Sequence, residues 1–101
     1  MAFLRTARAD EQLRDIVLYR TELTGSIDAG LALLDTLEAG FKQLSAFPES
    51  GALPRYAALR ARGYRVLIAE KYLAFYKIDK DSETVTIHAV VDGRRDYLNL
   101  V

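Results

Sequence analysis

The sequence predicts an α+β fold, in which an N-terminal strand and a helical hairpin pack on a small antiparallel sheet in the order β-α-α-β-β-β. Two observations predict it. Apolar residues recur every three or four positions in the first half of the chain, as in amphipathic helices. The last third contains three runs rich in β-branched and aromatic residues, joined by short polar turns. The chain has 101 residues, half of them hydrophobic, so we expect a single domain over residues 1–101.

The two predicted helices have clear start and stop signals. Phe3 and Leu4, the apolar pair before them, predict an edge strand. Thr6 is suited to cap a first helix from about Ala7 to Leu23, because its hydroxyl can accept a hydrogen bond from a free backbone N–H. Gly25 is suited to end that helix, and Ser26 to cap a second helix that runs from about residue 27 to residue 47. We therefore expect two antiparallel helices joined by a tight turn.

Two glycines, Gly30 and Gly40, lie inside the second predicted helix. Each costs up to about 1 kcal/mol of helix propensity relative to alanine. A glycine is tolerated inside a helix where a neighbouring element approaches closely. We therefore expect both glycines at a packing face.

The predicted strands cover about residues 63–69, 72–79 and 85–92, with turns at Glu70-Lys71 and at Lys80–Glu83. Charge indicates which face of this sheet looks away from the helices, because Arg65, Lys77 and His88 must reach water. Strict alternation then assigns a set of apolar residues to the same open face, namely Leu67, Leu73, Phe75 and Val90.

A monomer rarely leaves so much contiguous apolar surface bare. We expect a partner chain to cover this open face, since its charged residues argue against full burial within one chain. The alternative is that the connecting segment 48–62 folds back over the sheet.

The sequence contains few groups that could carry chemistry. It has no cysteine, no metal-ligand spacing, no Gly-rich phosphate loop and no nucleophile elbow, so we expect neither a metal nor a cofactor. His88 is the only histidine and a candidate general base, but no nucleophile is positioned near it by a motif. Arg94 and Arg95 follow the last strand and could bind phosphate or carboxylate, or could pair with neighbouring acids.

Charge is distributed unevenly along the neutral chain. Residues 1–54 carry 5 Lys/Arg and 8 Asp/Glu, a balance of −3, and residues 55–101 carry 9 and 6, a balance of +3. The positive half could attract nucleic acid or an acidic partner segment, although a solvated surface is the alternative. We expect a cytoplasmic protein without a membrane partner, since no signal peptide is evident and no run approaches about 18 apolar residues.

The order and spacing of several short sequence phrases are similar to the RelE/ParE superfamily of bacterial toxins, over nearly the whole chain. The phrases are Ala-Arg-Ala-Asp (7–10), Ile-Val-Leu-Tyr (16–19), Phe-Pro-Glu-Ser-Gly (47–51), Leu-Arg-Ala-Arg-Gly-Tyr-Arg (59–65), Tyr-Leu-Ala-Phe-Tyr (72–76) and Val-Val-Asp-Gly-Arg-Arg-Asp-Tyr (90–97). The resemblance implies the toxin of a type II toxin–antitoxin module, of the kind linked to plasmid stabilization. One branch of the superfamily cleaves messenger RNA on the ribosome, and the ParE branch poisons DNA gyrase.

The residues favour the ParE branch. The nuclease branch has an arginine where this chain has Leu73, and a second basic residue where it has Leu67. If the chain were a nuclease, the resemblance would make Arg65, Arg95 and Tyr97 its catalytic residues, with ribosome and messenger RNA as partners. A third possibility is a degenerate, non-toxic module that still binds an antitoxin.

The resemblance also implies partners and binding residues. DNA gyrase would be the target, bound through Arg94, Arg95 and Tyr97. A cognate antitoxin would neutralise the toxin by folding a disordered segment onto it, and operator DNA would be reached only through that antitoxin. The antitoxin-binding residues would be Arg65, Leu67, Leu73, Phe75 and Val90.

Overall fold

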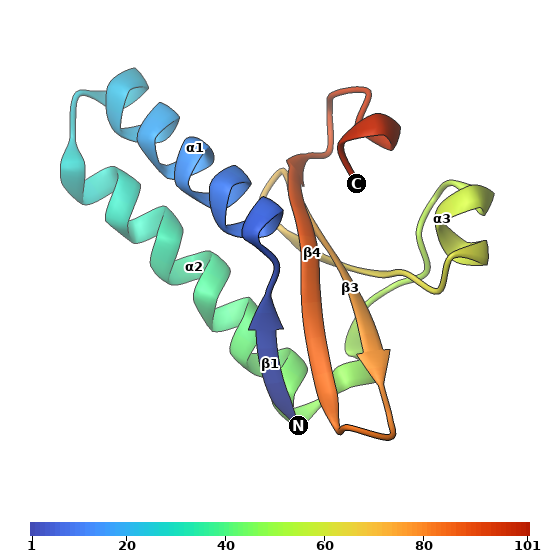
Figure 1. Cartoon of the computed structure of the whole chain (residues 1–101). Helices are drawn as coiled ribbons and strands as arrows, with labels where there is room; N and C mark the ends of the chain where they lie inside the picture. The colour runs from blue at the N-terminus through green and yellow to red at the C-terminus, as the bar shows by residue number, and fades with distance from the viewer.

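The computed structural model describes residues 1–101 and confirms the predicted element order (Figure 1). A strand and two long helices come first, β1 (Ala2–Arg5), α1 (Ala7–Thr24) and α2 (Ile27–Ala46). A connecting segment then contains the 3₁₀ turn η1 (Pro48–Ser50) and the short helix α3 (Ala57–Ala61). The chain ends with β2 (Arg65–Ala69), β3 (Tyr72–Asp79), β4 (Thr84–Asp92) and the 3₁₀ turn η2 (Leu98–Leu100).

The four strands form one sheet in the order β1-β4-β3-β2. Strands β2, β3 and β4 pair antiparallel through their short turns, as predicted. Strand β1 pairs parallel to β4. Parallel strands cannot be joined by a tight turn, so the chain between them includes a long connection that contains the hairpin of α1 and α2. Both helices lie against one face of the sheet, and the end of the hairpin that joins them extends beyond it (Figure 1).

The predicted helix caps are all present. The Thr6 hydroxyl accepts a hydrogen bond from the Ala9 N–H at 3.1 Å, and the Ser26 hydroxyl accepts one from the Ala29 N–H at 3.2 Å. Gly25 ends α1 with a φ of 67°, a backbone conformation that costs glycine little. These local signals fix where the hairpin turns.

Both helical glycines lie at packing faces, as predicted. A side chain at Gly30 would meet the hydroxyl of Thr21 and lie 3.1 Å from the carbonyl oxygen of Val17, both on α1. A side chain at Gly40 would lie 2.9 Å from Cδ2 of Leu67 on β2. The first glycine therefore allows close helix–helix contact, and the second allows α2 to approach the sheet.

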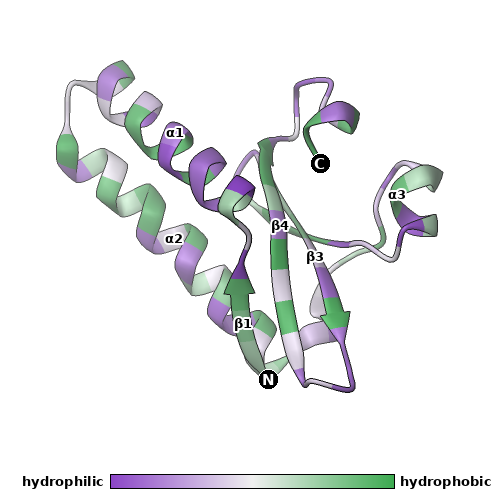
Figure 2. Ribbon diagram, viewed as in Figure 1, coloured by the Kyte–Doolittle hydropathy of each residue, from purple (hydrophilic) through white to green (hydrophobic).

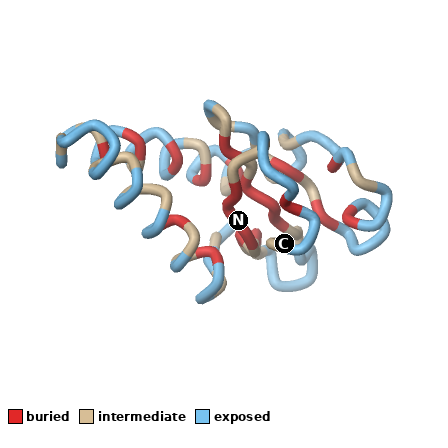
Figure 3. The backbone as a smooth tube through the Cα atoms, turned by 90° about the horizontal axis from the view of Figure 1, so that it is seen from above, coloured by how far each residue is buried: buried red, intermediate tan, exposed pale blue.

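The main core lies between the helices and the sheet, and hydrophobic residues recur along β1 and β4 (Figure 2). Its helical residues include Leu13, Leu37 and Phe41, and its strand residues include Tyr76 and Ile87. Buried residues concentrate in the strands and the adjoining helix turns, and much of the hairpin is exposed (Figure 3). The sheet therefore anchors the lower part of the hairpin and leaves its tip in solvent.

A β-bulge in β4 changes which residues face the helices. Tyr76 of β3 pairs with Ile87 and Phe75 pairs with Ala89, so His88 is an extra residue between two pairs. One extra residue exchanges the two faces beyond it. Val90 consequently lies in the helix-side core, and its assignment to the open face was wrong.

The faces of β2 are also the reverse of the prediction. Leu67 packs against the helix-side core, whereas Val66 lies on the other face. The prediction assumed that Arg65 must reach water. Instead its guanidinium donates hydrogen bonds to the carbonyl oxygens of Glu49 and Gly51, each at 2.8 Å. Backbone carbonyls in and just after η1 thus accept hydrogen bonds from Nη2 of this side chain on the helix side, and its buried Nε has no partner.

The face of the sheet that looks away from the helices, here called the outer face, is covered by the chain itself. A second core there joins Phe75, with 1% of its surface exposed, to Leu59 of α3 and Tyr97 of the C-terminal tail. Leu73 packs at its margin. The expectation that a partner chain covers this face was wrong, and the alternative, in which segment 48–62 folds back, is largely correct. The tail supplies the rest of the cover.

Candidate functional site

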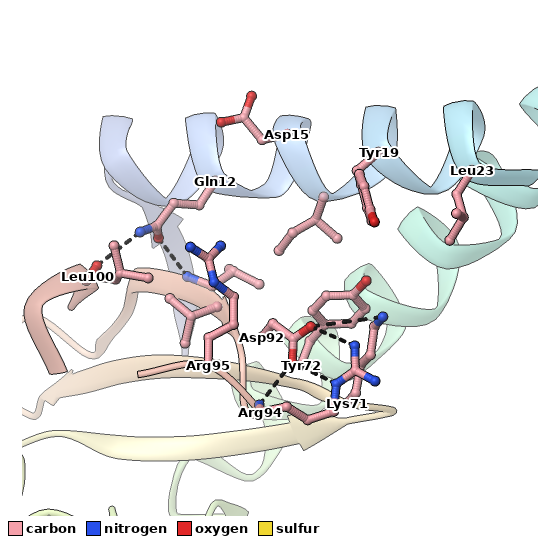
Figure 4. A pocket seen from close by; sticks show the side chains of 13 residues that line it. Gln12, Asp15, Tyr19, Leu23, Lys71, Tyr72, Asp92, Arg94, Arg95 and Leu100 are labelled. Atoms are coloured by element: carbon pink, nitrogen blue, oxygen red, sulfur yellow. Dashed lines mark hydrogen bonds and ion pairs between the residues drawn. The ribbon is translucent and has the colours of Figure 1, made fainter. Parts of the chain in front are cut away.

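An open groove lies between α1, the end of the β3–β4 pair and the C-terminal tail (Figure 4). It has a volume of about 930 Å³. Its lining comes from α1 (Gln12, Asp15, Ile16, Tyr19 and Leu23), from the strands and their turn (Lys71, Tyr72, Val90, Val91 and Asp92) and from the tail (Arg94, Arg95 and Leu100). Two of the three predicted target-binding residues therefore lie in it.

The α1 wall of this groove is an unpaired apolar stripe. Ile16, Tyr19 and Leu23 follow one another at helical spacing. Tyr19 is 59% exposed and Leu23 is 66% exposed, because the hairpin extends beyond the edge of the sheet. Ile27 continues the exposed apolar surface around the hairpin turn. An amphipathic segment of another chain could bury this stripe.

The opposite rim of the groove is charged and organised by Asp92. The Asp92 carboxylate accepts hydrogen bonds from the backbone N–H, Nε and Nη2 of Arg94 at 2.9, 3.2 and 3.1 Å. Lys71 Nζ lies 3.9 Å from the same carboxylate. The hydrogen bonds from Arg94, and then the charge of Lys71, hold the pKa of Asp92 below its ordinary value. The Asp92 carboxylate thus holds both Arg94 and Lys71 at the rim of the groove, and these three side chains together carry a net positive charge.

Arg95 is the free cation of the groove. It is exposed and takes part in none of the ion pairs of the chain. Figure 4 shows its side chain rising toward α1, whereas Arg94 turns toward Asp92. The two arginines therefore differ, because Arg94 is held by a neighbouring acid and Arg95 is available to a ligand.

Gln12 ties the groove together, and the sequence analysis did not identify it. Its Nε2 donates a hydrogen bond to the carbonyl oxygen of Leu100 at 2.9 Å, and its Oε1 accepts one from the Val90 N–H at 2.8 Å. The side chain thereby joins α1 to the edge of β4 beyond the end of β1 and to the tail (Figure 4). A lone glutamine on a helix gives no signal for such a contact.

Tyr97 does not line the groove with the two arginines. It is 4% exposed, and its ring lies 5.4 Å from the rings of both Tyr56 and Phe75 on the outer face. Burial raises the pKa of its phenol. The structure therefore does not bring Tyr97 together with Arg94 and Arg95, and Tyr97 instead anchors the tail that carries them.

The three residues named for a nuclease site are also not together. Arg65 pairs in register with Tyr76, whereas Arg95 follows the strand end that pairs with Tyr72. Four residues of strand separate those positions, or roughly 13 Å at about 3.3 Å per residue. Arg65 is engaged by backbone carbonyls and Tyr97 is buried on the outer face. No common substrate site joins the three.

His88 lies on the outer face rather than in the groove. Its ring is 5.6 Å from the ring of Tyr64 in an edge-to-face arrangement. Burial, and then the charge of Lys77, lowers its pKa below the ordinary histidine value. The imidazole is therefore less readily protonated than that of an ordinary exposed histidine.

Comparison with known proteins decides the family. A family model described as the ParE toxin of the type II toxin–antitoxin system parDE matches residues 4–97, nearly the whole chain. The chain belongs to the ParE toxin family. This confirms the resemblance to the RelE/ParE superfamily, and membership implies a cognate antitoxin as a partner.

A solved structure has the same fold as this ParE-family chain. It is the chromosomal ParDE toxin–antitoxin system from P. aeruginosa, with a TM-score of 0.73 and 19% sequence identity. The alignment covers 91% of this chain and 95% of that one. A comparison with curated proteins gave no significant match. None of the helices is both long and apolar enough to cross a lipid bilayer.

Proposed function

We propose that this ParE-family toxin binds and poisons DNA gyrase in the cytoplasm and that its antitoxin neutralises it by occupying the groove. The observation that carries the proposal is the groove itself, in which the exposed apolar stripe of α1 faces a cationic rim. Family membership supplies the toxin–antitoxin context. The absence of cysteine suits a reducing compartment.

The groove fits an amphipathic, acidic antitoxin segment. Tyr19 and Leu23 would receive its apolar side chains, and Lys71 and Arg95 would receive its carboxylates. Aromatic residues and arginines are the side chains that most often dominate binding energy at interfaces. Of the five residues predicted to bind antitoxin, Val90 lines the groove, Phe75 is buried and Arg65 donates to backbone carbonyls. Leu67 and Leu73 are both partly exposed, Leu67 on the helix side of the sheet and Leu73 on the outer face.

The same groove is proposed to contact the target. Arg95 would reach gyrase directly, Arg94 would support it at the rim, and Tyr97 would hold the tail in place through its ring contacts. An antitoxin segment lying in the groove would cover both arginines. Neutralisation would then follow from simple occlusion, without a conformational change in the toxin.

A gyrase supercoiling assay tests the target. Purified toxin should inhibit supercoiling and accumulate cleaved plasmid, and the double change Arg94→Gln with Arg95→Gln should weaken this by tenfold or more. The control is Arg8→Gln with Arg14→Gln, which removes the same charge from exposed α1 residues outside the groove and should stay within about twofold. Unchanged supercoiling at micromolar excess of toxin, with cleavage of messenger RNA on ribosomes instead, would contradict the gyrase proposal.

Antitoxin binding to paired alanine variants tests the occlusion. Tyr19→Ala with Leu23→Ala should weaken binding about a hundredfold, because each removes a large exposed apolar group from the groove wall. The matched control is Leu18→Ala with Leu31→Ala, two exposed leucines of the hairpin that do not line the groove. Equal losses in both pairs would mean that the antitoxin binds elsewhere on the hairpin.

A further inference from the structure

The outer face carries a set of cations that no part of the proposed mechanism uses. Residues 50–69 contain four arginines and no acidic residue. Arg55 and Arg62 are exposed, and Lys77 is partly exposed beside them on the sheet. We call Arg55, Arg62 and Lys77 the outer basic surface.

Aromatic rings hold these cations in place. Arg62 lies 5.4 Å and Lys77 4.6 Å from the centre of the Tyr64 ring, and Arg55 lies 5.8 Å from the centre of the Tyr56 ring. Such cation–π contacts restrain long side chains that would otherwise be mobile.

The rings themselves form one continuous row across the outer face. Tyr56 contacts Tyr97 at 5.4 Å, Tyr97 contacts Phe75 at 5.4 Å, and Phe75 contacts Tyr64 at 6.3 Å between ring centres. The row therefore places one cation at its first end and two at its other end. Separate, restrained positive charges along one face can contact successive negative charges of an extended ligand.

None of the three cations is neutralised by a carboxylate. The ion pairs of the chain involve other cations, on the helices, in the turns and at the rim of the groove. Two neighbouring arginines, Arg60 and Arg65, donate to backbone carbonyls, which leaves their full charge in the field. The nearest acid along β3, Asp79, accepts hydrogen bonds from the N–H groups of the following turn.

We infer that the outer basic surface binds the phosphate backbone of nucleic acid without reading its sequence. Charge alone suffices for phosphate contacts. The rings behind the cations have little free surface for stacking bases, because Tyr64 is only 5% exposed and Tyr56 is partly buried against Tyr97. The cations also stand on the opposite side of the sheet from the groove, whose exposed apolar wall suits a peptide.

This inference departs from the expectation that the toxin meets DNA only through its antitoxin. It stands apart from the gyrase proposal, because the binding can be measured with no gyrase present. The toxin would contribute phosphate contacts of its own wherever a partner brings it close to nucleic acid.

Fluorescence anisotropy of toxin freed of antitoxin, titrated onto a labelled duplex at several salt concentrations, tests the inference. Arg55→Gln with Arg62→Gln should weaken binding about tenfold at low salt, and should reduce the slope of log K against log salt by about 1.8 for two lost phosphate contacts. Arg8→Gln with Arg14→Gln, exposed on α1, loses the same charge and should change affinity by less than about twofold.

Three outcomes would overturn the inference. The first is no binding to duplex or single strand at low salt, and the second is an equal loss in both paired variants. The third is equal binding of a polyglutamate peptide of the same charge, which would assign the surface to an acidic protein instead. Lys77→Gln, tested alone, should give a smaller loss in the same direction and checks the far end of the aromatic row.

Discussion

Arg65 is the residue that led to the wrong prediction of which face of β2 packs against the helices. As a charged residue on a strand it was expected to reach water, and it was one of three residues named for a nuclease site. In the structure its Nη2 is committed to the carbonyl oxygens of Glu49 and Gly51. Tyr76 reinforces the same segment, because its hydroxyl donates to the Pro48 carbonyl oxygen at 2.7 Å and accepts from the Gly51 N–H at 3.0 Å. Arg65 therefore holds the η1 segment against the sheet.

Replacing Arg65 by methionine should lower the free energy of unfolding by about 2 kcal/mol, because two charge-assisted hydrogen bonds are lost and two carbonyls lose their partner. Urea unfolding followed by circular dichroism measures this. The control is Arg14→Met, an exposed arginine of α1 outside every ion pair and hydrogen bond, which should change stability by less than about 0.5 kcal/mol. Equal stability of the two variants would show that Arg65 has no such clamping role.

Asp92 gives a prediction on pH dependence. Its pKa is depressed in the folded chain by the hydrogen bonds from Arg94, below an ordinary value of 3.8. A depressed pKa contributes stability that is present above the unfolded value and is lost as the pH falls through the folded value. In Arg94→Gln, carbon-detected NMR should find the Asp92 pKa moved upward toward 3.8. The free energy of unfolding of this variant should therefore depend less on pH in the acid range. An unchanged titration of Asp92 in the variant would contradict the pairing.

At the scale of elements, the sequence predicted the helices better than the faces of the strands. Helix starts and stops depend on neighbouring residues, so Thr6, Gly25 and Ser26 were sufficient to place the hairpin. The face of a strand depends on register, and the extra residue at His88 reversed it for Val90. Nothing in the local sequence Thr-Ile-His-Ala-Val marks a bulge. The groove was missed for a similar reason, since it is formed by α1, a strand edge and the tail, which are far apart in sequence.

The two helical glycines predict different effects for the same substitution. Gly30→Ala should lower the free energy of unfolding by about 2 kcal/mol, because the new methyl group meets Thr21 and the α1 backbone, despite about 1 kcal/mol gained in helix propensity. Gly40→Ala should change it by less than about 1 kcal/mol, because only the end of the Leu67 side chain must move. Thermal or urea unfolding of both variants compares them. A larger loss of unfolding free energy for Gly40→Ala than for Gly30→Ala would mean that the contact between α1 and α2 can shift to admit a methyl group, whereas the contact between α2 and Leu67 cannot.

At the scale of the whole molecule, the two sides of the sheet differ in character. The helix side ends in a groove with an apolar wall and a cationic rim, and the outer face carries cations over a buried aromatic row. The cations of the outer face agree with the uneven charge of the sequence, because the C-terminal half of the chain carries the positive balance. The cover of the outer face by segment 48–62 was one of two alternatives that the sequence offered. The part played by the tail was not foreseen, because it depends on contacts of Tyr97 with Tyr56 and Phe75, which are far from it in sequence.

We propose that this ParE-family chain acts on DNA topology and not on messenger RNA. Inducible expression in bacteria, with chromosomal DNA integrity and translation rate scored together, tests it most directly. If the toxin poisons gyrase, the cells should filament and their DNA should break while translation continues. Both effects should be reduced by Arg94→Gln with Arg95→Gln and relieved by co-expressed antitoxin. Rapid arrest of translation with intact DNA would contradict gyrase as the target and would indicate a ribosome-dependent nuclease.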